Sequence, residues 1–130
     1  LGILYASAEI IAVLNKIKPP YNINQLTQEK ALEILNDYDK IKLSTKKILN
    51  QKQYLEKALQ KFSFIEKIYP SDANFILIKV DNATERYNEL IKKGIVIRNR
   101  TNDDLCENCL RITVGTKEEN EKLIVELSSF

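Results

Sequence analysis

Hydrophobic positions follow one period in the first half of this chain and another in the second, and the change falls near Phe62. Before Phe62, apolar residues recur every three or four positions, which is typical of helices that bury one face. After it, short apolar runs bounded by turn residues predict strands, with helical stretches between and after them. The pattern therefore predicts a helical first half followed by a mixed α and β second half.

A cap and a pair of prolines mark the first segments. Residues 1–6 alternate and predict a short strand. Ser7 suits the N-cap of a helix that continues to about Ile17. Pro19-Pro20 ends this helix and begins an extended connector, because proline donates no backbone hydrogen bond and disfavours helical geometry in the residue before it. The buried stripe of the helix is expected at Ile10, Ile11, Val13, Leu14 and Ile17.

Two more helices are predicted before the period changes, over about 24–36 and about 38–61. In the longer helix, apolar residues recur every seven positions from Ile41 to Phe62 and mark the face that packs. The lysines of this helix are interrupted by Glu56 and by glutamines. A solvated helix face is therefore favoured over a basic binding patch.

The second half is predicted to contain four strands and two helices. The strands are expected at 64–69, 74–80, 95–97 (ending on Arg98) and 110–114, and the helices at 83–93 and from Thr116 to about Leu127. Asn82 with Glu85, and Thr116 with Glu119, have the spacing of capping boxes, and Gly94 suits the position after a helix. The order β-β-α-β-β-α predicts an α+β two-layer sandwich with helices on one sheet face.

Composition excludes more chemistry than it suggests. The 20 basic and 18 acidic residues leave a formal net charge of +2, which gives no electrostatic reason to expect nucleic acid or a membrane as partner. The absence of histidine excludes a histidine base, a histidine metal ligand and a Ser-His or Cys-His dyad within the chain. The isolated glycines form no phosphate-binding loop, and no metal site is expected. No apolar run reaches the length of a membrane span, and the chain is expected to be cytoplasmic.

The two cysteines form a C-x-x-C pair, Cys106 and Cys109. Such a pair can be a redox dithiol or half of a zinc site. A thioredoxin-like pair is expected at a strand-to-helix turn, whereas Cys109 leads into a strand, and a structural zinc site needs four ligands. The spacing alone is a weak signal, and coincidence is the favoured interpretation.

Two arginines stand in strand-like runs, Arg98 in GIVIRNR and Arg111 in LRITVGTKEEN. Arginine presents a planar, permanently charged fork that suits a carboxylate or a phosphate. Side chains alternate along a strand, so Arg111 is expected to project from the sheet face opposite the helices. From spacing alone, pairing with a local carboxylate or with water is the favoured interpretation of both arginines. Arg100 has Asp103 and Asp104 as nearby partners.

Five stretches of the chain resemble, in this order, the C-terminal part of the histidinol-phosphate aminotransferases, fold-type I enzymes that use pyridoxal phosphate. They are LGILYAS (1–7), LNKIKPPYNIN (14–24), PSDANFILIKV (70–80), KKGIVIRNR (92–100) and LRITVGTKEENEKLI (110–124). SDANF and LRITVGTKEEN are the specific ones, while the helices alone would match many families. The resemblance implies that residues 1–130 are the small C-terminal domain of such an enzyme, with 1–17 at the seam with a large domain.

The resemblance also implies roles for the two arginines. Arg111 matches the arginine that holds the carboxylate of the amino-acid substrate, and Arg98 matches a second anion-binding arginine used with the phosphate-bearing substrate and with glutamate. How the two divide these anions stays open. The implied reaction moves an amino group between L-histidinol phosphate and 2-oxoglutarate in histidine biosynthesis, and the implied enzyme is a homodimer.

Three features of this resemblance have no match in the chain: the lysine that forms the Schiff base, the A-G-x-R stretch that contacts the cofactor phosphate, and the aspartate that pairs with the pyridine nitrogen. We therefore expect a piece of a longer protein that carries no catalytic and no cofactor-binding residue. Alone, it is expected neither to bind pyridoxal phosphate specifically nor to transaminate. Its partners are expected to be the small-molecule substrates of the parent enzyme.

Alternatives remain open at this point. Another class I or II aminotransferase, such as an aromatic one, or a threonine-phosphate decarboxylase would share the two arginines and differ in a substrate pocket that lies mostly outside this chain. A free-standing binding module without a catalytic parent is a hypothesis of a different class. The residues encoded immediately before Leu1 would separate that hypothesis from an enzyme.

Overall fold

The computed structural model of this chain describes residues 4–19 and 23–130. The chain forms two compact units, one up to Lys42 and one from Leu43 to Phe130. The first unit contains α1 (Ala8–Ile17), α2 (Gln25–Leu35) and the start of α3 (Tyr38–Leu59), so all three predicted helices are confirmed. No helix in the described ranges is long and apolar enough to span a membrane.

The helices of the first unit begin and end where the sequence predicts. The side chain of Ser7 accepts a hydrogen bond from the N–H of Ile10, and that of Asn24 accepts one from Thr27. These contacts satisfy backbone donors that have no partner inside a helix. Lys18 is the C-cap of α1, directly before Pro19, as the proline rule requires. Residues 20–22 of the expected connector lie outside the described residues.

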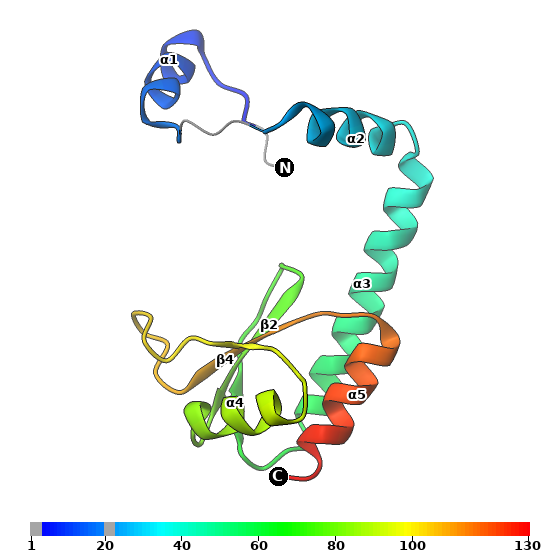
Figure 1. The fold of residues 1–130 in the computed structure, drawn as a ribbon, viewed down its shortest axis with the longest axis vertical. Coiled ribbons are helices and arrows are strands. Elements are labelled where there is room, and N and C mark those ends of the chain that lie inside the picture. The colour runs from blue at the N-terminus through cyan, green and yellow to red at the C-terminus, as the bar shows by residue number, and fades with distance from the viewer. Residues whose placement is uncertain (1–3, 20–22) are drawn as a thin grey trace. The chain divides into compact units, whose positions relative to one another are not determined.

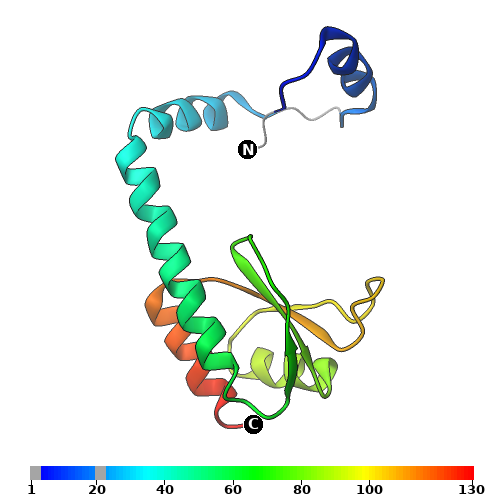
Figure 2. The ribbon, with the colours of Figure 1, turned by 180° about the vertical axis from the view of Figure 1, so that it is seen from behind.

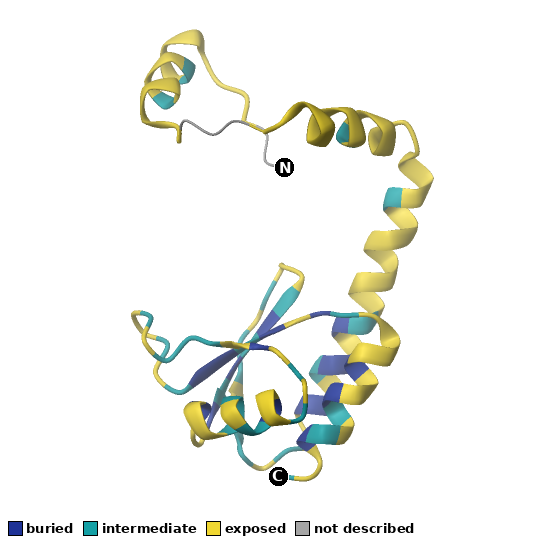
Figure 3. Cartoon of the chain, in the orientation of Figure 1, coloured by how far each residue is buried: buried dark blue, intermediate teal, exposed yellow. Residues whose placement is uncertain are grey.

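Two predictions for this unit are wrong. Residues 4–6 form no strand, because no described segment pairs with them; residues 1–3 of that prediction lie outside the described residues. The stripe of α1 is not buried: Ile10, Val13 and Ile17 are 53%, 57% and 72% exposed, and no residue of α1 or α2 is buried (Figure 3). Periodicity identifies the apolar face of a helix, whereas its burial requires a second surface to cover it.

The second unit is an antiparallel four-stranded sheet with the order β1-β2-β4-β3. Its strands are β1 (Ile65–Ile68), β2 (Phe75–Val80), β3 (Arg98–Asn99) and β4 (Cys109–Thr113), and its own helices are α4 (Ala83–Lys92) and α5 (Lys117–Leu127). The second-unit part of α3 and α5 run side by side in both views (Figures 1 and 2). The predicted order β-β-α-β-β-α is confirmed.

The core lies between one face of the sheet and the three helices. Alternate residues of β2 and β4 are buried, while the residues between them are half-buried or exposed, with Cys109 the exception. The buried cluster contains Leu55, Leu59, Ile76, Ile78, Val80, Leu90, Leu110, Ile112, Leu123 and Leu127. Burial of each such side chain stabilises the fold by about 1.5–3 kcal/mol. The helices therefore cover one sheet face, and the predicted two-layer sandwich is confirmed.

The third strand is displaced from its predicted position. The prediction places it at 95–97, whereas pairing with β4 occurs at Arg98–Asn99. Ile97 is buried and Ile95 packs beside it against the core, while Val96 is exposed. This alternation imitates a strand. The backbone pairs with β4 only after Ile97. The apolar residues 95–97 therefore come before the residues that form the strand, and the two do not coincide.

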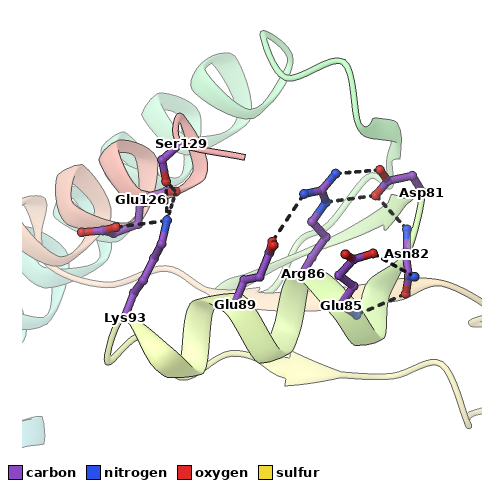
Figure 4. Close-up of polar contacts among 8 residues, drawn as sticks. All are labelled: Asp81, Asn82, Glu85, Arg86, Glu89, Lys93, Glu126 and Ser129. Atoms are coloured by element: carbon purple, nitrogen blue, oxygen red, sulfur yellow. Dashed lines mark hydrogen bonds and ion pairs between the residues drawn. The ribbon is translucent and has the colours of Figure 1, made fainter.

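A polar network joins α4 to the strand before it and to the end of α5 (Figure 4). The Arg86 guanidinium lies 2.8 Å from Asp81 Oδ2 and 3.4 Å from Glu89 Oε2. Lys93 Nζ lies 3.4 Å from Glu126 Oε2 and donates to Ser129 Oγ. Arg86 and Lys93 are thus paired with carboxylates of the same unit.

Candidate anion-binding site

Arg98 and Arg111 lie directly opposite each other in the ladder between β3 and β4. Residues opposite each other in an antiparallel pair point to the same face, with Cβ atoms about 4.5–5.5 Å apart. Leu110 and Ile112, on either side of Arg111, point into the core. Arg111 therefore lies on the face opposite the helices, as alternation predicts, and the register brings Arg98 beside it. The sequence did not predict that proximity.

Neither arginine has a carboxylate partner among residues 4–19 and 23–130. Every ion pair there involves other cations, and Arg111 Nε is buried without a hydrogen-bond partner. Like charges directly opposite on a sheet destabilise it, and a buried N–H without an acceptor costs about 1–3 kcal/mol. Of the two interpretations that spacing alone favours, pairing with a local carboxylate does not occur within these residues, while hydration of the arginines stays open. An external anion would relieve both costs.

The guanidinium of Arg111 is held against an aromatic ring. Its Cζ lies 5.1 Å from the centroid of Phe75, the diagonal neighbour on β2, and Leu77 lies directly opposite Arg111 in the ladder. A cation over a ring face is stabilised by about 0.5–1 kcal/mol or more. The contact restrains the side chain while the in-plane N–H groups stay available. The result is an oriented fork, which is the geometry that binds a carboxylate or phosphate through two parallel hydrogen bonds.

The same sheet face carries a second pair of like charges. Lys67 and Lys79 are opposite each other in the ladder between β1 and β2, and Lys79 Nζ lies 4.0 Å from Glu66 Oε2. Glu66 is the additional residue at an irregularity in β1, between the pairs Ile65–Val80 and Lys67–Lys79. We call the residues Lys67, Lys79, Arg98 and Arg111 the basic face. Its electrostatic potential favours an anionic ligand.

Arg100 differs from the two arginines of the candidate site. Its guanidinium pairs with Asp103, as the sequence predicts, and both side chains are about 40% exposed. Its backbone N–H continues the ladder by donating to the carbonyl of Cys109. Arg100 therefore has its own counter-ion in a solvated loop, and it is a natural control for experiments on its neighbours.

Buried polar side chains fix the segments on either side of the site. Asn120 is 2% exposed, accepts from the N–H of Gly115 at 3.0 Å and donates to its carbonyl at 3.0 Å and to Gln51 of α3 at 2.9 Å. Lys52, also on α3, donates to the carbonyl of Ser71. Helix α3 is thus tied both to the turn after β4 and to the turn before β2. These residues position the strands that carry Arg111 and Phe75.

Neither of these positioning residues is predicted by the sequence. Asn120 belongs to the stretch LRITVGTKEEN, which indicates no role for it, and Lys52 falls among the lysines predicted to lie on a solvated face, which is wrong for this one. The available signal for Lys52 was weak: it precedes Leu55 by three positions and so lies on the apolar face of α3. Lys52 is only 7% exposed. Its hydrogen-bond partner, the carbonyl of Ser71, lies 19 residues further along the chain, so the helix pattern could not show it.

A hollow of about 720 Å³ lies elsewhere, between α3 and the turn that follows β4. Its lining includes Ile48, Gln51, Val114 and Glu119, and it contains neither arginine of the candidate site. Glu119 belongs to the capping box of α5, and Gln51 bonds Asn120. Two polar groups of the hollow are therefore already used in the fold, and the basic face, with two opposed arginines, is the better candidate for ligand binding.

The chemistry that the side chains of the basic face themselves offer is binding. Burial raises the pKa of the Cys109 thiol, which disfavours the reactive thiolate. Within the described ranges, no group of three or more histidine, cysteine, aspartate or glutamate side chains could hold a metal ion. What the arrangement can do is bind and orient an anionic small molecule.

Comparison with known proteins identifies the family of this chain. Residues 1–127 match the family described as aminotransferase class I and II. The chain belongs to that family. Its predicted fold class is confirmed by solved aminotransferase structures: the histidinol-phosphate aminotransferase from Clostridium acetobutylicum superposes with a TM-score of 0.80 at 28% identity, over 93% of this chain and 37% of that one.

Curated members of the aminotransferase family are closer in sequence. The histidinol-phosphate aminotransferase of Flavobacterium psychrophilum is 64% identical over 129 residues, which are 99% of this chain and 37% of that protein. The enzyme of the same description in Christiangramia forsetii is 63% identical over 124 residues, 95% of this chain and 35% of the relative. The chain thus spans little more than a third of the length of the curated relatives it matches.

The likeness of fold extends to a solved protein with a different description. The L-threonine-O-3-phosphate decarboxylase from Porphyromonas gingivalis superposes with a TM-score of 0.77 at 23% identity, over 96% of this chain and 39% of that one. At that identity the likeness shows the fold alone.

Proposed function

We propose that this chain is the C-terminal domain of a histidinol-phosphate aminotransferase, in which Arg98 and Arg111 bind the anionic groups of the substrates. The observation that carries the proposal is the pair of opposed guanidinium groups without a carboxylate partner in the described chain. The identity of 63–64% to enzymes of that description supports the substrate class. The proposed reaction moves an amino group between L-histidinol phosphate and 2-oxoglutarate.

The two substrates explain why an arginine pair is useful. One carries a phosphate ester and the other carries carboxylates, so the same site has to accept two kinds of anion in turn. A guanidinium fork forms two parallel hydrogen bonds with either group, whereas a lysine acts as a single point charge. Arg111, restrained by Phe75, would hold the anionic group next to the reacting carbon. Arg98, which is exposed at the end of the short strand β3, would provide the second charge.

The parent enzyme is proposed to act as a homodimer with pyridoxal phosphate, which supplies the chemistry of amino transfer when it is bound. The described residues of this chain do not fit that cofactor by themselves. Glu66 is already paired with Lys79 and Asp103 with Arg100, so neither is free to pair with a pyridine nitrogen. The buried Lys52 donates to a backbone carbonyl. We propose that the cofactor is held by residues of the parent outside this chain.

The test is a set of charge-conserving substitutions in the full-length protein. Arg111→Lys is expected to lower kcat/KM for L-histidinol phosphate by about 10- to 100-fold, because it removes one charge-assisted hydrogen bond and the stacking on Phe75. Arg98→Lys is expected to have a smaller effect. Arg100→Lys, whose ion pair with Asp103 lies in the neighbouring loop, is the matched control and should leave turnover unchanged.

The outcomes separate the role of the arginines from the choice of substrate. Loss of turnover in Arg100→Lys equal to that in Arg111→Lys would contradict a specific anion site. Full activity of both Arg98→Lys and Arg111→Lys would contradict it as well. Wild-type turnover of aromatic amino acids or of threonine phosphate in preference to L-histidinol phosphate would leave the anion site standing and reject the substrate.

A further inference from the structure

Cys106 and Cys109 are the first and last residues of one tight turn. The N–H of Cys109 donates to the carbonyl of Cys106 at 3.0 Å, and Asn108, the third residue of the turn, has a φ of 53°. A positive φ at that position is typical of a type II turn, which brings the first and fourth Cα atoms within about 7 Å. Disulfide-bonded cysteines have Cα atoms about 4.4–6.8 Å apart. The turn therefore holds the two residues at a spacing that a disulfide can bridge.

The two thiols differ in their surroundings. Burial is the main reason that the pKa of the Cys109 thiol is raised, while Tyr69 and Lys79 lower it, and Cys109 Sγ donates to the carbonyl of Glu107 at 3.6 Å. Cys109 is 1% exposed and Cys106 is half-buried, so a reagent from solvent meets Cys106 first. The pair thus consists of an accessible thiol and a shielded one at the two ends of the same turn.

The loop around the cysteines is built in a fixed conformation. Leu105 has a φ of 61°, and the N–H of Cys106 donates to the carbonyl of Asp103, so a second turn directly precedes the first. Asn108 is tied to the rest of the unit on both sides: its carbonyl accepts from Val80 and its side chain from the N–H of Ala83. Two non-glycine residues with positive φ require support from surrounding contacts. These contacts organise the cysteine turn in advance.

We propose that Cys106 and Cys109 are a site of reversible disulfide formation, with a peroxide or a small-molecule disulfide as the oxidant. With hydrogen peroxide, the Cys106 thiolate attacks one oxygen, an S–O bond forms, the O–O bond breaks and hydroxide leaves. The Cys109 sulfur then attacks the Cys106 sulfur, an S–S bond forms and a second hydroxide leaves. The protons of the two thiols convert both hydroxides to water. A thiol reductant reverses the step by exchange.

This inference does not depend on the proposed function. It rests on the turn and on the different exposure of the two thiols, and it replaces the interpretation of the C-x-x-C spacing as coincidence. The site nevertheless adjoins the basic face, because Cys109 precedes Arg111 by two residues on β4 and its carbonyl accepts from the N–H of Arg100. Its test can therefore be made on thiol chemistry alone.

The decisive measurement is the equilibrium of the pair with reduced and oxidised glutathione, in the folded 130-residue chain and in the same chain under denaturant. A turn organised in advance should favour the disulfide at least about tenfold in the folded chain, which corresponds to about 30 mV for a two-electron couple. The readout is the intact mass after alkylation of free thiols. An equal or weaker tendency in the folded chain would overturn the proposal.

Variants identify the order of attack. Under peroxide, Cys109→Ser is expected to accumulate a sulfenic acid at Cys106 that a 1,3-diketone traps, whereas the wild type loses both thiols without a trapped adduct. Cys106→Ser should react more slowly than Cys109→Ser because the remaining thiol is buried. Stable oxygen adducts on the wild-type cysteines, or faster reaction of Cys106→Ser, would overturn the mechanism. The glutathione equilibrium uses the wild type and holds even where a variant fails to fold.

Discussion

At the scale of single residues, cations of the same kind have different surroundings on the two sides of the sheet. Arg86 is enclosed by carboxylates and lies 4.7 Å and 5.1 Å from the ring centroids of Phe64 and Phe130. Arg111 has one ring, one buried N–H without a partner and an arginine opposite it. The contacts of Arg86 with carboxylates and rings stabilise the fold, whereas Arg111 lacks an anionic partner among the described residues. This contrast is the reason to propose anion binding at one site and structure at the other.

The ion pair of Asp81 and Arg86 predicts a specific pH dependence. The Arg86 side chain holds the pKa of Asp81 below its ordinary value of 3.8, chiefly by hydrogen bonding and against the opposing effect of burial. A lowered folded-state pKa adds stability that is fully present above the unfolded value and is lost as the pH falls through the folded value. Asp81→Asn should therefore destabilise the chain at about pH 7, and the difference should close as the pH falls below about 3.8.

Urea denaturation across this pH range measures the effect. Asp72→Asn, in an exposed turn without an ion pair to a described residue, is the control and should change the free energy of unfolding little. A difference between Asp81→Asn and wild type that stays constant from neutral to acid pH would contradict the assigned cause. A difference that grows in acid would have the wrong sign.

The role of Asn120 is a second prediction at this scale. Asn120→Ala leaves the N–H and the carbonyl of the half-buried Gly115 without their side-chain partner. We expect the free energy of unfolding to fall by about 1–3 kcal/mol, because each of two part-buried polar groups loses a hydrogen bond. Asn88→Ala, on the exposed side of α4, should stay within about 0.5 kcal/mol of wild type. Thermal or urea denaturation provides the measurement, and equal effects in the two variants would contradict the assigned role.

At the scale of elements, caps and turns decide where the segments of the site begin. Thr116 and Glu119 form the predicted capping box, with Glu119 accepting from the N–H of Thr116 at 2.8 Å. Asn82 caps α4 through the N–H of Glu85, although Glu85 accepts from the Asn82 side chain and not from its backbone. Gly94 follows α4 with a φ of 72°. Each boundary is set by local chemistry, which is why the sequence predicted it.

Gly94 provides the prediction at this scale. An added Cβ would meet no atom within 4 Å, so the cost of Gly94→Ala comes from the left-handed backbone and not from a clash. That cost is about 1–2 kcal/mol, and asparagine tolerates the conformation better than alanine does. Gly94→Ala should therefore lower the free energy of unfolding by about that amount and Gly94→Asn by less. An equal loss in the two variants would point to a different cause, and urea denaturation distinguishes them.

At the scale of the whole molecule, the two units differ in how much they bury. The second unit has its own core between the sheet and three helices, whereas the helices α1 and α2 of the first unit contain no buried residue. Short helices without tertiary packing are marginal in water, because their stability comes mainly from an apolar face that is covered. The apolar stripe of α1 has the pattern of a helix face that packs against another surface, but its residues are largely exposed to solvent in this structure.

Hydrogen exchange of the isolated chain tests this difference. Amides of α1 and α2 are expected to exchange at close to the rate of unfolded peptide, while those of β2 and β4 should be protected up to the stability of the whole unit. The Ile76 and Ile112 amides are suitable reporters of the sheet, and the Val13 amide is a suitable reporter of α1. Comparable protection of Val13 and Ile76 would contradict the prediction and would indicate that another surface covers the helix.

Most of the fold could be predicted because its determinants are local. The helices, β1, β2, β4 and the caps follow from periodicity and from residues within a few positions of each boundary. The predictions failed where the outcome depends on a distant surface: the burial of the α1 stripe and the offset of β3 against Ile95 and Ile97. The sequence also had no means to show that Lys52 meets the carbonyl of Ser71.

The sequence by itself determined the α+β order of elements, the ends of the helices and the presence of two arginines in strand-like runs. Only the tertiary structure decided that Arg98 and Arg111 face each other without a carboxylate, and that Cys106 and Cys109 lie in one turn. The reason is the range of the interactions. Helix and strand patterns depend on neighbours a few residues away, whereas strand register sets contacts across the sheet, and a change of one residue moves a side chain to the other face.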